Sequence, residues 1–274
     1  MTDATDPQRF TDLGRPRRVW AVAAVHGEAG RLAALHGAIR DAIRPGDRVV
    51  YLGNMIGRGA HVRATLDEML AFRRDVIARP GMLAEDVVYL RGMQEEMWQK
   101  LLQLQFAPNP AEVLQWMLGQ GLEPTLRAYG GDVQEGFAAA RGGATAIARW
   151  GAALRASMRS APGHEQLMTA LRRAAFTAIT SGARSALLFV NAGVDPSRPL
   201  FNQGDRFWWA GGGFNRVTER YEGFDRLVRG YDPQQDGLFA ADHRVSLDAG
   251  CGFGGPLVCG VFAATGDLIE VVEA

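Results

Sequence analysis

The sequence predicts an α/β fold in which a parallel sheet carries a helical insertion. Three observations predict it: short apolar runs alternate with helix-like segments from residue 17 to residue 95, helical periodicity continues to about residue 183, and apolar runs return after residue 185. Alternation of strands and helices is typical of parallel sheets whose loops gather at the carboxyl ends of the strands. With 274 residues, 47% of them hydrophobic, the chain has ample material for a core.

The first part of the sheet is expected from three successive units of strand, loop and helix. Each strand is a short apolar run that ends at a glycine-containing loop, as buried parallel strands do. The first helix ends before Pro45 and Gly46, which terminate helices. The expected strands are Arg18–Val25, Arg48–Leu52 and Asp86–Leu90, and the expected helices are Gly30–Ile43 and Val62–Ala78.

The remainder is expected to be a helical layer followed by further strands. Helical periodicity runs from Glu95 to about Gly182, with breaks at proline and glycine clusters, and we interpret residues 97–183 as an inserted cap. The strands expected after it are Ser185–Val190, Arg226–Arg229, Arg244–Leu247, Pro256–Ala263 and Leu268–Val272. A four-residue turn separates the last two, which predicts a hairpin.

Composition argues against several classes of partner. Thirty basic and thirty acidic residues give a formal net charge of zero, so no overall field draws the protein toward nucleic acid or a membrane surface. Residues 1–16 are polar, without an apolar signal segment, and no run is long and apolar enough to span a bilayer. Cys251 and Cys259 lack metal-ligand spacing and are expected as reduced core thiols. We therefore expect a cytoplasmic protein with no nucleic-acid or membrane partner, made of a flexible leader (residues 1–16) and one domain (residues 17–274).

Five loops, each after an expected strand, carry a series of residues that recur in a definite order. They are His26-Gly27, Gly53-Asn54 with Arg58-Gly59, Arg91-Gly92 with Glu95, Asn191-Ala192-Gly193, and Arg229-Gly230-Tyr231-Asp232-Pro233. This series resembles the motifs of calcineurin-like metallophosphoesterases, most closely those of bacterial serine/threonine protein phosphatases, over residues 17–274. The resemblance implies a metallophosphoesterase-type β-sandwich flanked by helices (α/β/β/α), with a helical insertion.

In that family two metal ions share a bridging carboxylate and activate a water molecule between them. The resemblance places Ala24, Asn54 and Gly57 at aspartate positions of the family, and Gln94 at the position of its proton-donating histidine. The other metal ligands are changed as well. The degenerate metal-ligand positions are Ala24, His26, Asn54, Met93, Asn191, Arg229 and Tyr231, of which only His26 keeps the family residue.

One imidazole and two carboxamides do not meet the ligand requirements of Mn²⁺, Mg²⁺ or Zn²⁺. Arg229 is expected to put a fixed positive charge near the place of a cation. We therefore expect no metal, no other cofactor and no catalytic residue, which indicates a pseudophosphatase that acts as a binding or regulatory protein. The alternative is a metal-dependent phosphoesterase of residual or altered activity, which would hold Mn²⁺ or another divalent metal through carboxylates such as Asp195, Asp205 and Asp232.

Arg58 matches the phosphate-clamping arginine of the family, and a guanidinium can hold a phosphate through two parallel hydrogen bonds. A structural arginine that bonds loop carbonyls is the other interpretation. The expected anion pocket consists of Arg58, His26, Asn54, Gln94, Asn191 and Arg229. Its ligand would be a phosphate-containing small molecule, or the partner would be a protein of unknown identity. A third hypothesis is a structural subunit with Trp208 and Trp209 at a partner surface, although core packing is the preferred interpretation of these tryptophans.

Overall fold

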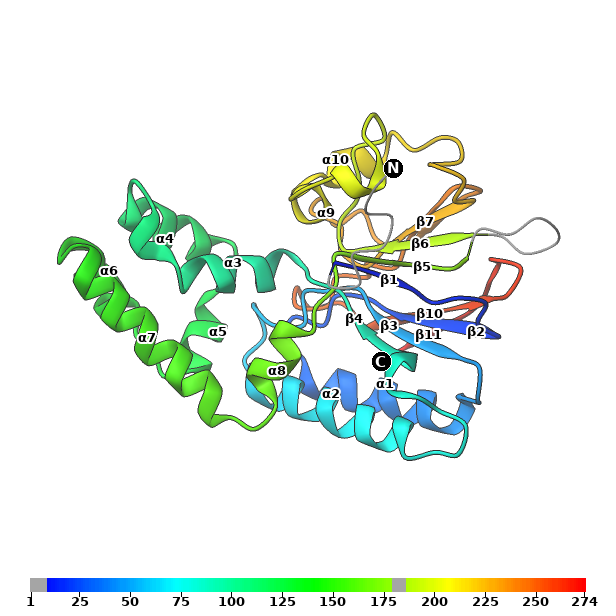
Figure 1. Ribbon diagram of the computed structural model, residues 1–274, viewed down its shortest axis with the longest axis horizontal. Helices are drawn as coiled ribbons and strands as arrows, with labels where there is room; N and C mark the ends of the chain where they lie inside the picture. The colour runs from blue at the N-terminus through cyan, green and yellow to red at the C-terminus, as the bar shows by residue number, and fades with distance from the viewer. Residues whose placement is uncertain (1–8, 179–185) are drawn as a thin grey trace.

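The computed structural model describes residues 9–178 and 186–274 and contains two β-sheets packed face to face between layers of helices (Figure 1). This is the α/β/β/α order that the sequence resemblance implied. An apolar core between the sheets includes Val50, Phe189 and Phe262. A second and larger core, which includes Leu32 and Leu66, lies under the helices.

The five-stranded sheet contains the three parallel strands predicted for the first part of the chain. In spatial order its strands are β11 (Leu268–Glu273), β10 (Val258–Ala263), β2 (Arg18–Val22), β3 (Arg48–Tyr51) and β4 (Val87–Tyr89). β2, β3 and β4 are parallel, and β10 and β11 form the predicted antiparallel hairpin. β2, β3 and β4 end earlier than predicted because the apolar runs continue into the buried loops.

The six-stranded sheet contains three predicted strands and three that the sequence did not predict. In spatial order its strands are β1 (Phe10–Asp12), β5 (Ala174–Phe176), β6 (Leu187–Val190), β7 (Arg226–Arg229), β9 (Arg244–Ser246) and β8 (Phe239–Ala240). The strands β6, β7 and β9 were predicted, although Ser185 lies outside the described residues. The strands β1, β5 and β8 have at most three residues, too few to show an alternating pattern in the sequence.

Two of these short strands correct the predicted boundaries. β1 lies in the segment predicted as a flexible leader, where Phe10 and Leu13 are buried and β1 pairs in parallel with β5. The leader prediction is therefore wrong for residues 10–13, and residues 1–8 lie outside the described part of the chain. β5 lies in the predicted cap, so that prediction is wrong for residues 174–176. Residues 179–183 of the predicted cap also lie outside the described part.

Helices cover both outer faces of the sandwich (Figure 1). α1 (Ala29–Ala42) and α2 (Val62–Ile77) lie on the five-stranded sheet and match the two predicted helices. The short helices α9 (Arg206–Trp209) and α10 (Gly211–Phe214) lie beyond the six-stranded sheet, after η3 (Leu200–Asn202).

The chain between β4 and β5 is mainly helical, and most of it forms a lobe that extends away from the sandwich (Figure 1). Asn109 and Asp132 begin two of its helices, because their side chains accept hydrogen bonds from backbone amides of the first turn. Its helices are α3 (Met93–Leu101), η2 (Leu104–Phe106), α4 (Pro110–Gly119), α5 (Glu123–Ala128), α6 (Val133–Arg141), α7 (Ala144–Ser160) and α8 (His164–Thr169), and η1 (Ala84–Asp86) precedes β4.

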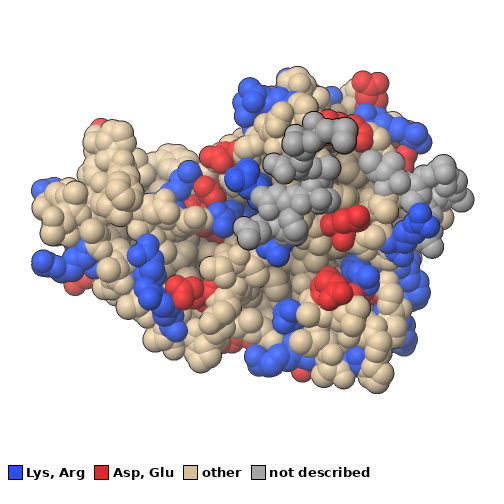
Figure 2. All heavy atoms as spheres, viewed as in Figure 1, with Lys and Arg blue, Asp and Glu red and all other residues tan. Residues whose placement is uncertain are grey.

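The face of the molecule shown in Figure 2 carries both signs of charge. On this face, basic and acidic side chains are interspersed and neither sign covers a broad area. Among the described helices, none is long and apolar enough to cross a membrane.

Candidate functional site

The loops that carry the motif residues meet at the carboxyl ends of the parallel strands. The backbone amide of His26 donates to the carbonyl of Asn54 at 2.7 Å, which joins the loops after β2 and β3. The amide of Ala24 donates to the carbonyl of Gly230 at 2.9 Å, and the amide of Gly230 donates to the carbonyl of Asn191 at 3.1 Å. The fold therefore assembles the motif residues at one end of the sandwich.

Three motif residues have a left-handed backbone, which non-glycine residues rarely adopt. The φ angles of His26, Asn54 and Arg58 are 51°, 54° and 38°. In the described part of the chain only two other non-glycine residues have positive φ. Strained backbone of this kind persists where the surroundings hold it, often in functional loops.

The two carboxamides at metal-ligand positions are used as links between loops. The Oδ1 atom of Asn54 accepts a hydrogen bond from the Gln94 amide at 3.0 Å. The Oδ1 atom of Asn191 accepts one from the Met93 amide at 3.2 Å, and its Nδ2 donates to the Leu52 carbonyl at 2.8 Å. Both side chains are fully buried, although Nδ2 of Asn54 has no hydrogen-bond partner among the described residues. These bonds hold the loops after β3, β4 and β6 together.

Gln94 fills the space above Gly57 and ties the site to the helical lobe. Its Nε2 donates to the carbonyl of Gln120, beyond the end of α4, at 2.8 Å. The amide of Gly57 donates to the hydroxyl of Thr125 in α5 at 2.9 Å. A Cβ atom on Gly57 would overlap the Gln94 carboxamide, so the two residue types fit each other. Gln94 therefore links the motif loops to the helical lobe.

His26 is uncharged and lies buried among the motif loops. Its side chain is fully buried, and burial, helped by the positive charge of Arg58, lowers its pKa to about 3. The rings of Tyr231 and Phe253 meet it edge-on, with centroids at 5.6 Å and 5.9 Å. Neither ring nitrogen makes a well-formed hydrogen bond among the described residues, although the nearby Ile56 backbone opposes the fall of the pKa.

Arg58 is partly exposed and supplies a positive charge near His26. Its guanidinium carbon lies 3.9 Å from the centroid of the Phe253 ring, in cation–π geometry. Its backbone amide donates to the Gly121 carbonyl at 2.8 Å, and its buried Nε has no partner among the described residues. Burial raises the pKa of Tyr231, and the nearby Arg58 charge opposes that rise. The arrangement leaves an oriented cation with hydrogen-bonding capacity.

Arg229 has a different environment from the one expected for a free cation. Its Nη2 lies 2.6 Å from the carboxylate of Asp232, its Nε donates to the Ser246 hydroxyl at 3.0 Å, and its guanidinium stacks on Phe214. Burial lowers its pKa, and Asp232 opposes this change. Because Asp232 neutralises it, Arg229 is a buried ion-pair partner and does not present an uncompensated charge to the site.

The carboxylates considered as alternative metal ligands do not converge. Each carboxylate forms ion pairs with different basic residues. Asp195 pairs with Arg206 and Arg216, Asp205 pairs with Lys100, and Asp232 pairs with Arg229. Among residues 9–178 and 186–274, no group of three or more His, Cys, Asp or Glu side chains could hold a metal ion.

Glu95, which the sequence analysis placed in the third motif loop, binds the loop after β3 to the start of α3. Its buried carboxylate accepts hydrogen bonds from the backbone amides of Asn54, Met55, Ile56 and Gly92, at 2.7 to 3.2 Å. Burial raises its pKa, and the amide donors oppose the rise. A glutamate three residues after Gly92, at the third helical position, is the signal of a capping box and predicts the Gly92 bond, but the contacts with the β3 loop depend on tertiary structure.

The two tryptophans have different environments. Trp208 is buried and its Nε1 donates to the Arg91 carbonyl at 2.7 Å, which agrees with core packing. Trp209 remains 39% exposed and lies against Trp116 of α4, with ring centroids 5.6 Å apart. This pair connects α9 with the helical lobe.

Comparison with solved structures relates this architecture to phosphoesterases. A candidate diadenosine tetraphosphatase superposes with a TM-score of 0.55 at 15% identity, covering 97% of this chain and 98% of that chain. A cold-active protein tyrosine phosphatase superposes with a TM-score of 0.54 at 11% identity, covering 99% of this chain and 83% of that chain. The chain has the fold of these two phosphatases, which agrees with the metallophosphoesterase-type α/β/β/α sandwich that the sequence resemblance implied. No protein-family model matches the sequence, and no curated protein matches it.

The metallophosphoesterase fold normally carries a two-metal centre at these loops, and the residues present here do not fit one. Ala24 contributes no donor atom, and Asn54 and Asn191 are engaged with backbone groups. His26 is the only imidazole at a ligand position, and divalent ions at phosphoesterase sites need several anionic or imidazole ligands.

Proposed function

We propose that this protein is a pseudophosphatase, which keeps the metallophosphoesterase fold and acts as a binding or regulatory protein. The observation that supports the proposal is that side chains at the degenerate metal-ligand positions form hydrogen bonds within the protein. Asn54 and Asn191 bond to backbone groups of neighbouring loops, and Gln94 joins the site to the helical lobe. These bonds stabilise the loops without a metal ion. Carboxylates at the same positions would repel each other if no cation lay between them.

The ligand that suits the remaining groups is an oxyanion of a phosphate-containing small molecule. The guanidinium of Arg58 lies over the ring of Phe253, and its Nε has no hydrogen-bond partner among the described residues. His26 is neutral and fully buried, so it adds no second charge and does not face the solvent. Asn191 and Arg229 are buried and engaged with other groups, so neither contacts the proposed ligand. A cytoplasmic location and the absence of nucleic-acid and membrane partners belong to the same proposal.

Metal content and activity of the purified protein test the proposal most directly. After equilibration with Mn²⁺ and removal of free ions, we expect no stoichiometric metal by elemental analysis and no metal-dependent hydrolysis of p-nitrophenyl phosphate. Two bound ions per chain with Mn²⁺-dependent turnover would instead support a phosphoesterase of residual activity.

Thermal denaturation with inorganic phosphate tests the oxyanion site, because a ligand that binds the folded state raises its stability. We expect phosphate to raise the Tm of the wild type and of Arg74→Ala, an exposed arginine on α2, and to leave the Tm of Arg58→Ala unchanged. Equal shifts in all three proteins would refute the role of Arg58. If a protein partner is found and Trp209→Ala alone abolishes its binding, the structural-subunit hypothesis gains support.

A further inference from the structure

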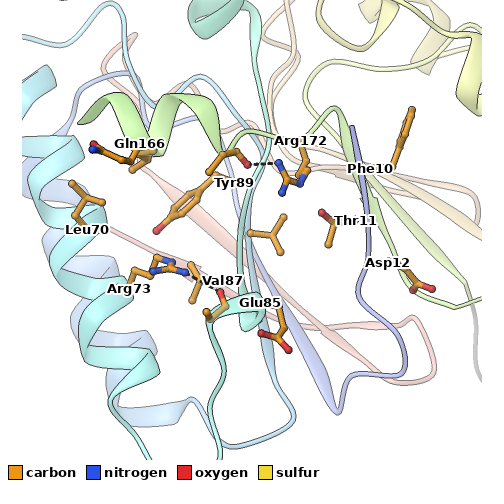
Figure 3. A pocket seen from close by; sticks show the side chains of 14 residues that line it. Phe10, Thr11, Asp12, Leu70, Arg73, Glu85, Val87, Tyr89, Gln166 and Arg172 are labelled. Carbon is orange, nitrogen blue, oxygen red and sulfur yellow. Dashed lines mark hydrogen bonds between the residues drawn. The ribbon is translucent and has the colours of Figure 1, made fainter. Parts of the chain in front are cut away.

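A groove of about 570 Å³ opens between the edges of the two sheets and shares no lining residue with the motif loops (Figure 3). β1 and β4 form two of its walls, and α2, α8 and η1 supply the others. Figure 3 shows Thr11 pointing from β1 toward β4, and Leu70 and Arg73 extending from α2. The lining is mainly apolar and includes Leu70, Val87, Val88 and Leu167.

Both strands that bound this groove are edge strands. β4 is the last strand of the five-stranded sheet, and β1 is the last strand of the six-stranded sheet. Edge strands carry backbone N–H and C=O groups that no neighbouring strand satisfies, and such edges accept extended peptides as an additional strand. The groove therefore offers backbone pairing as well as apolar contacts.

The outer edge of β4 already forms the beginning of a parallel ladder. The Arg172 amide donates to the Tyr89 carbonyl at 2.8 Å, and the Arg91 amide donates to the Arg172 carbonyl at 2.7 Å. Residues two apart along a strand direct their backbone groups to the same side. The backbone N–H and C=O groups of Val87 therefore face the outer side of β4, as the carbonyl of Tyr89 does. Among the described residues no further strand extends this ladder to Val87, since Arg172 forms an isolated bridge and the chain then continues as β5 in the other sheet. An extended segment can continue the ladder along the groove.

Charge defines the kind of segment that fits. Arg73 and Arg172 both line the groove and form no ion pair with a described carboxylate; their guanidinium groups donate to the carbonyls of Ala84 and Ala170. Each guanidinium keeps further N–H groups, which bind carboxylates strongly. Asp12 and Glu85 lie farther along the groove from Arg172 (Figure 3) and disfavour a second acidic residue at that end.

We propose that this groove binds an extended peptide segment of a partner protein, which pairs with the outer edge of β4, buries apolar side chains between β1, α2 and α8, and places a carboxylate against Arg73 and Arg172. Alternate side chains of a bound strand point to opposite faces, so a segment that alternates valine with polar residues and carries one acidic residue for Arg73 and Arg172 matches the groove. The site is independent of the Arg58 pocket and gives the protein a second binding surface.

The test uses the full chain and a fluorescein-labelled, acetylated peptide of about eight residues that alternates valine with serine and carries one glutamate in place of a central serine. Fluorescence anisotropy should show saturable binding that is at least tenfold tighter than that of the matched peptide with lysine in place of the glutamate. Arg73→Glu and Arg172→Glu should each weaken binding about tenfold or more, with folding checked by circular dichroism. Arg74→Glu, on the same helix but exposed and outside the groove, should bind as the wild type does.

Hydrogen exchange and sedimentation complete the test. The peptide should slow amide exchange in residues 87–89, and Arg58→Ala should leave peptide binding unchanged, which separates this site from the oxyanion pocket. Equal binding of the acidic and basic peptides, no saturation up to millimolar concentration, or unchanged exchange in β4 would overturn the proposal. Self-association that Arg73→Glu abolishes would overturn it in favour of a second copy of this chain as the occupant.

Discussion

The carboxamide of Gln94 occupies the space that any side chain at position 57 would need. A Cβ atom built on Gly57 overlaps the Gln94 side chain, and Gly57 has a φ of 91°, which side-chain-bearing residues rarely adopt. The carboxamide is held in place by its bond to the Gln120 carbonyl. Glycine at position 57 and glutamine at position 94 are thus physically coupled.

Gly57→Asp should destabilise the protein by about 2 to 4 kcal/mol, because it combines steric overlap, backbone strain and a buried carboxylate. The free energy of unfolding in urea measures this change. In the double variant Gly57→Asp with Gln94→Ala the overlap disappears, so the loss should be smaller than the sum of the two single losses. Additive effects would contradict the coupling. Gly119→Ala, where an added Cβ meets no atom within 4 Å, serves as the control.

Glu95→Gln should lower the stability by about 2 to 4 kcal/mol, since one side-chain oxygen would be replaced by an NH₂ group that faces backbone N–H donors. Amides of residues 54–56 should then exchange faster with solvent. Glu123→Gln is the matched control, because Glu123 forms an exposed ion pair with Arg127 in α5 and the loss should be about 1 kcal/mol or less. Equal losses in both variants would show that Glu95 does not hold the β3 loop.

Much of the fold follows from local sequence, and the remainder depends on contacts between distant segments. β2, β3 and β4 were predictable because each is an apolar run before a glycine loop, and β10 and β11 because a short turn joins them. β1 was not predictable, because its three residues become a strand only through pairing with β5, more than 160 residues later.

The site shows the same division between local and distant information. The motif order located His26, Asn54, Gln94 and Asn191, which the fold brings together. It also suggested an uncompensated charge on Arg229, yet the structure pairs this arginine with Asp232 three residues away. In a loop, three residues of separation do not determine whether two side chains meet, so only the tertiary structure reveals this ion pair.

Asp232→Asn should destabilise the protein by about 3 to 5 kcal/mol, because it leaves the guanidinium of Arg229 buried without its counter-charge. The variant Arg229→Met with Asp232→Asn removes the charge as well and should recover part of the loss. Urea unfolding of the two single variants and the double variant forms the thermodynamic cycle. A coupling energy near zero would contradict a buried ion pair. Asp267→Asn, at an exposed pair with Arg226, should change stability by less than 1 kcal/mol.

His36 should make the stability fall in mild acid. It is fully buried between Glu68 and the Tyr51 hydroxyl, and burial lowers its pKa from 6.5 to about 4, although Glu68 and Asp75 oppose the shift and Arg40 supports it. Between these two values the unfolded chain binds a proton that the folded chain does not, so stability is present above pH 6.5 and decreases as the pH falls toward 4. From pH 7 to pH 5 this residue should reduce the free energy of unfolding by about 2 kcal/mol. His36→Gln should be less stable at pH 7 and show a flatter profile, and parallel profiles would exclude the residue as the cause.

Asn54→Asp introduces a carboxylate at the position to which the sequence resemblance assigns a bridging aspartate, and it tests whether the site can hold a metal. The new oxygen would replace Nδ2, which is buried and has no partner among the described residues, so a charge there would be neither solvated nor paired. We expect a loss of about 1 to 3 kcal/mol in the free energy of unfolding at pH 7. Because Ala24, Met93 and Asn191 supply no further anionic ligand, Mn²⁺ at millimolar concentration should not restore the stability. A Tm that rises with Mn²⁺ in this variant and not in Asn202→Asp, an exposed control, would show that the loops still form a cation site.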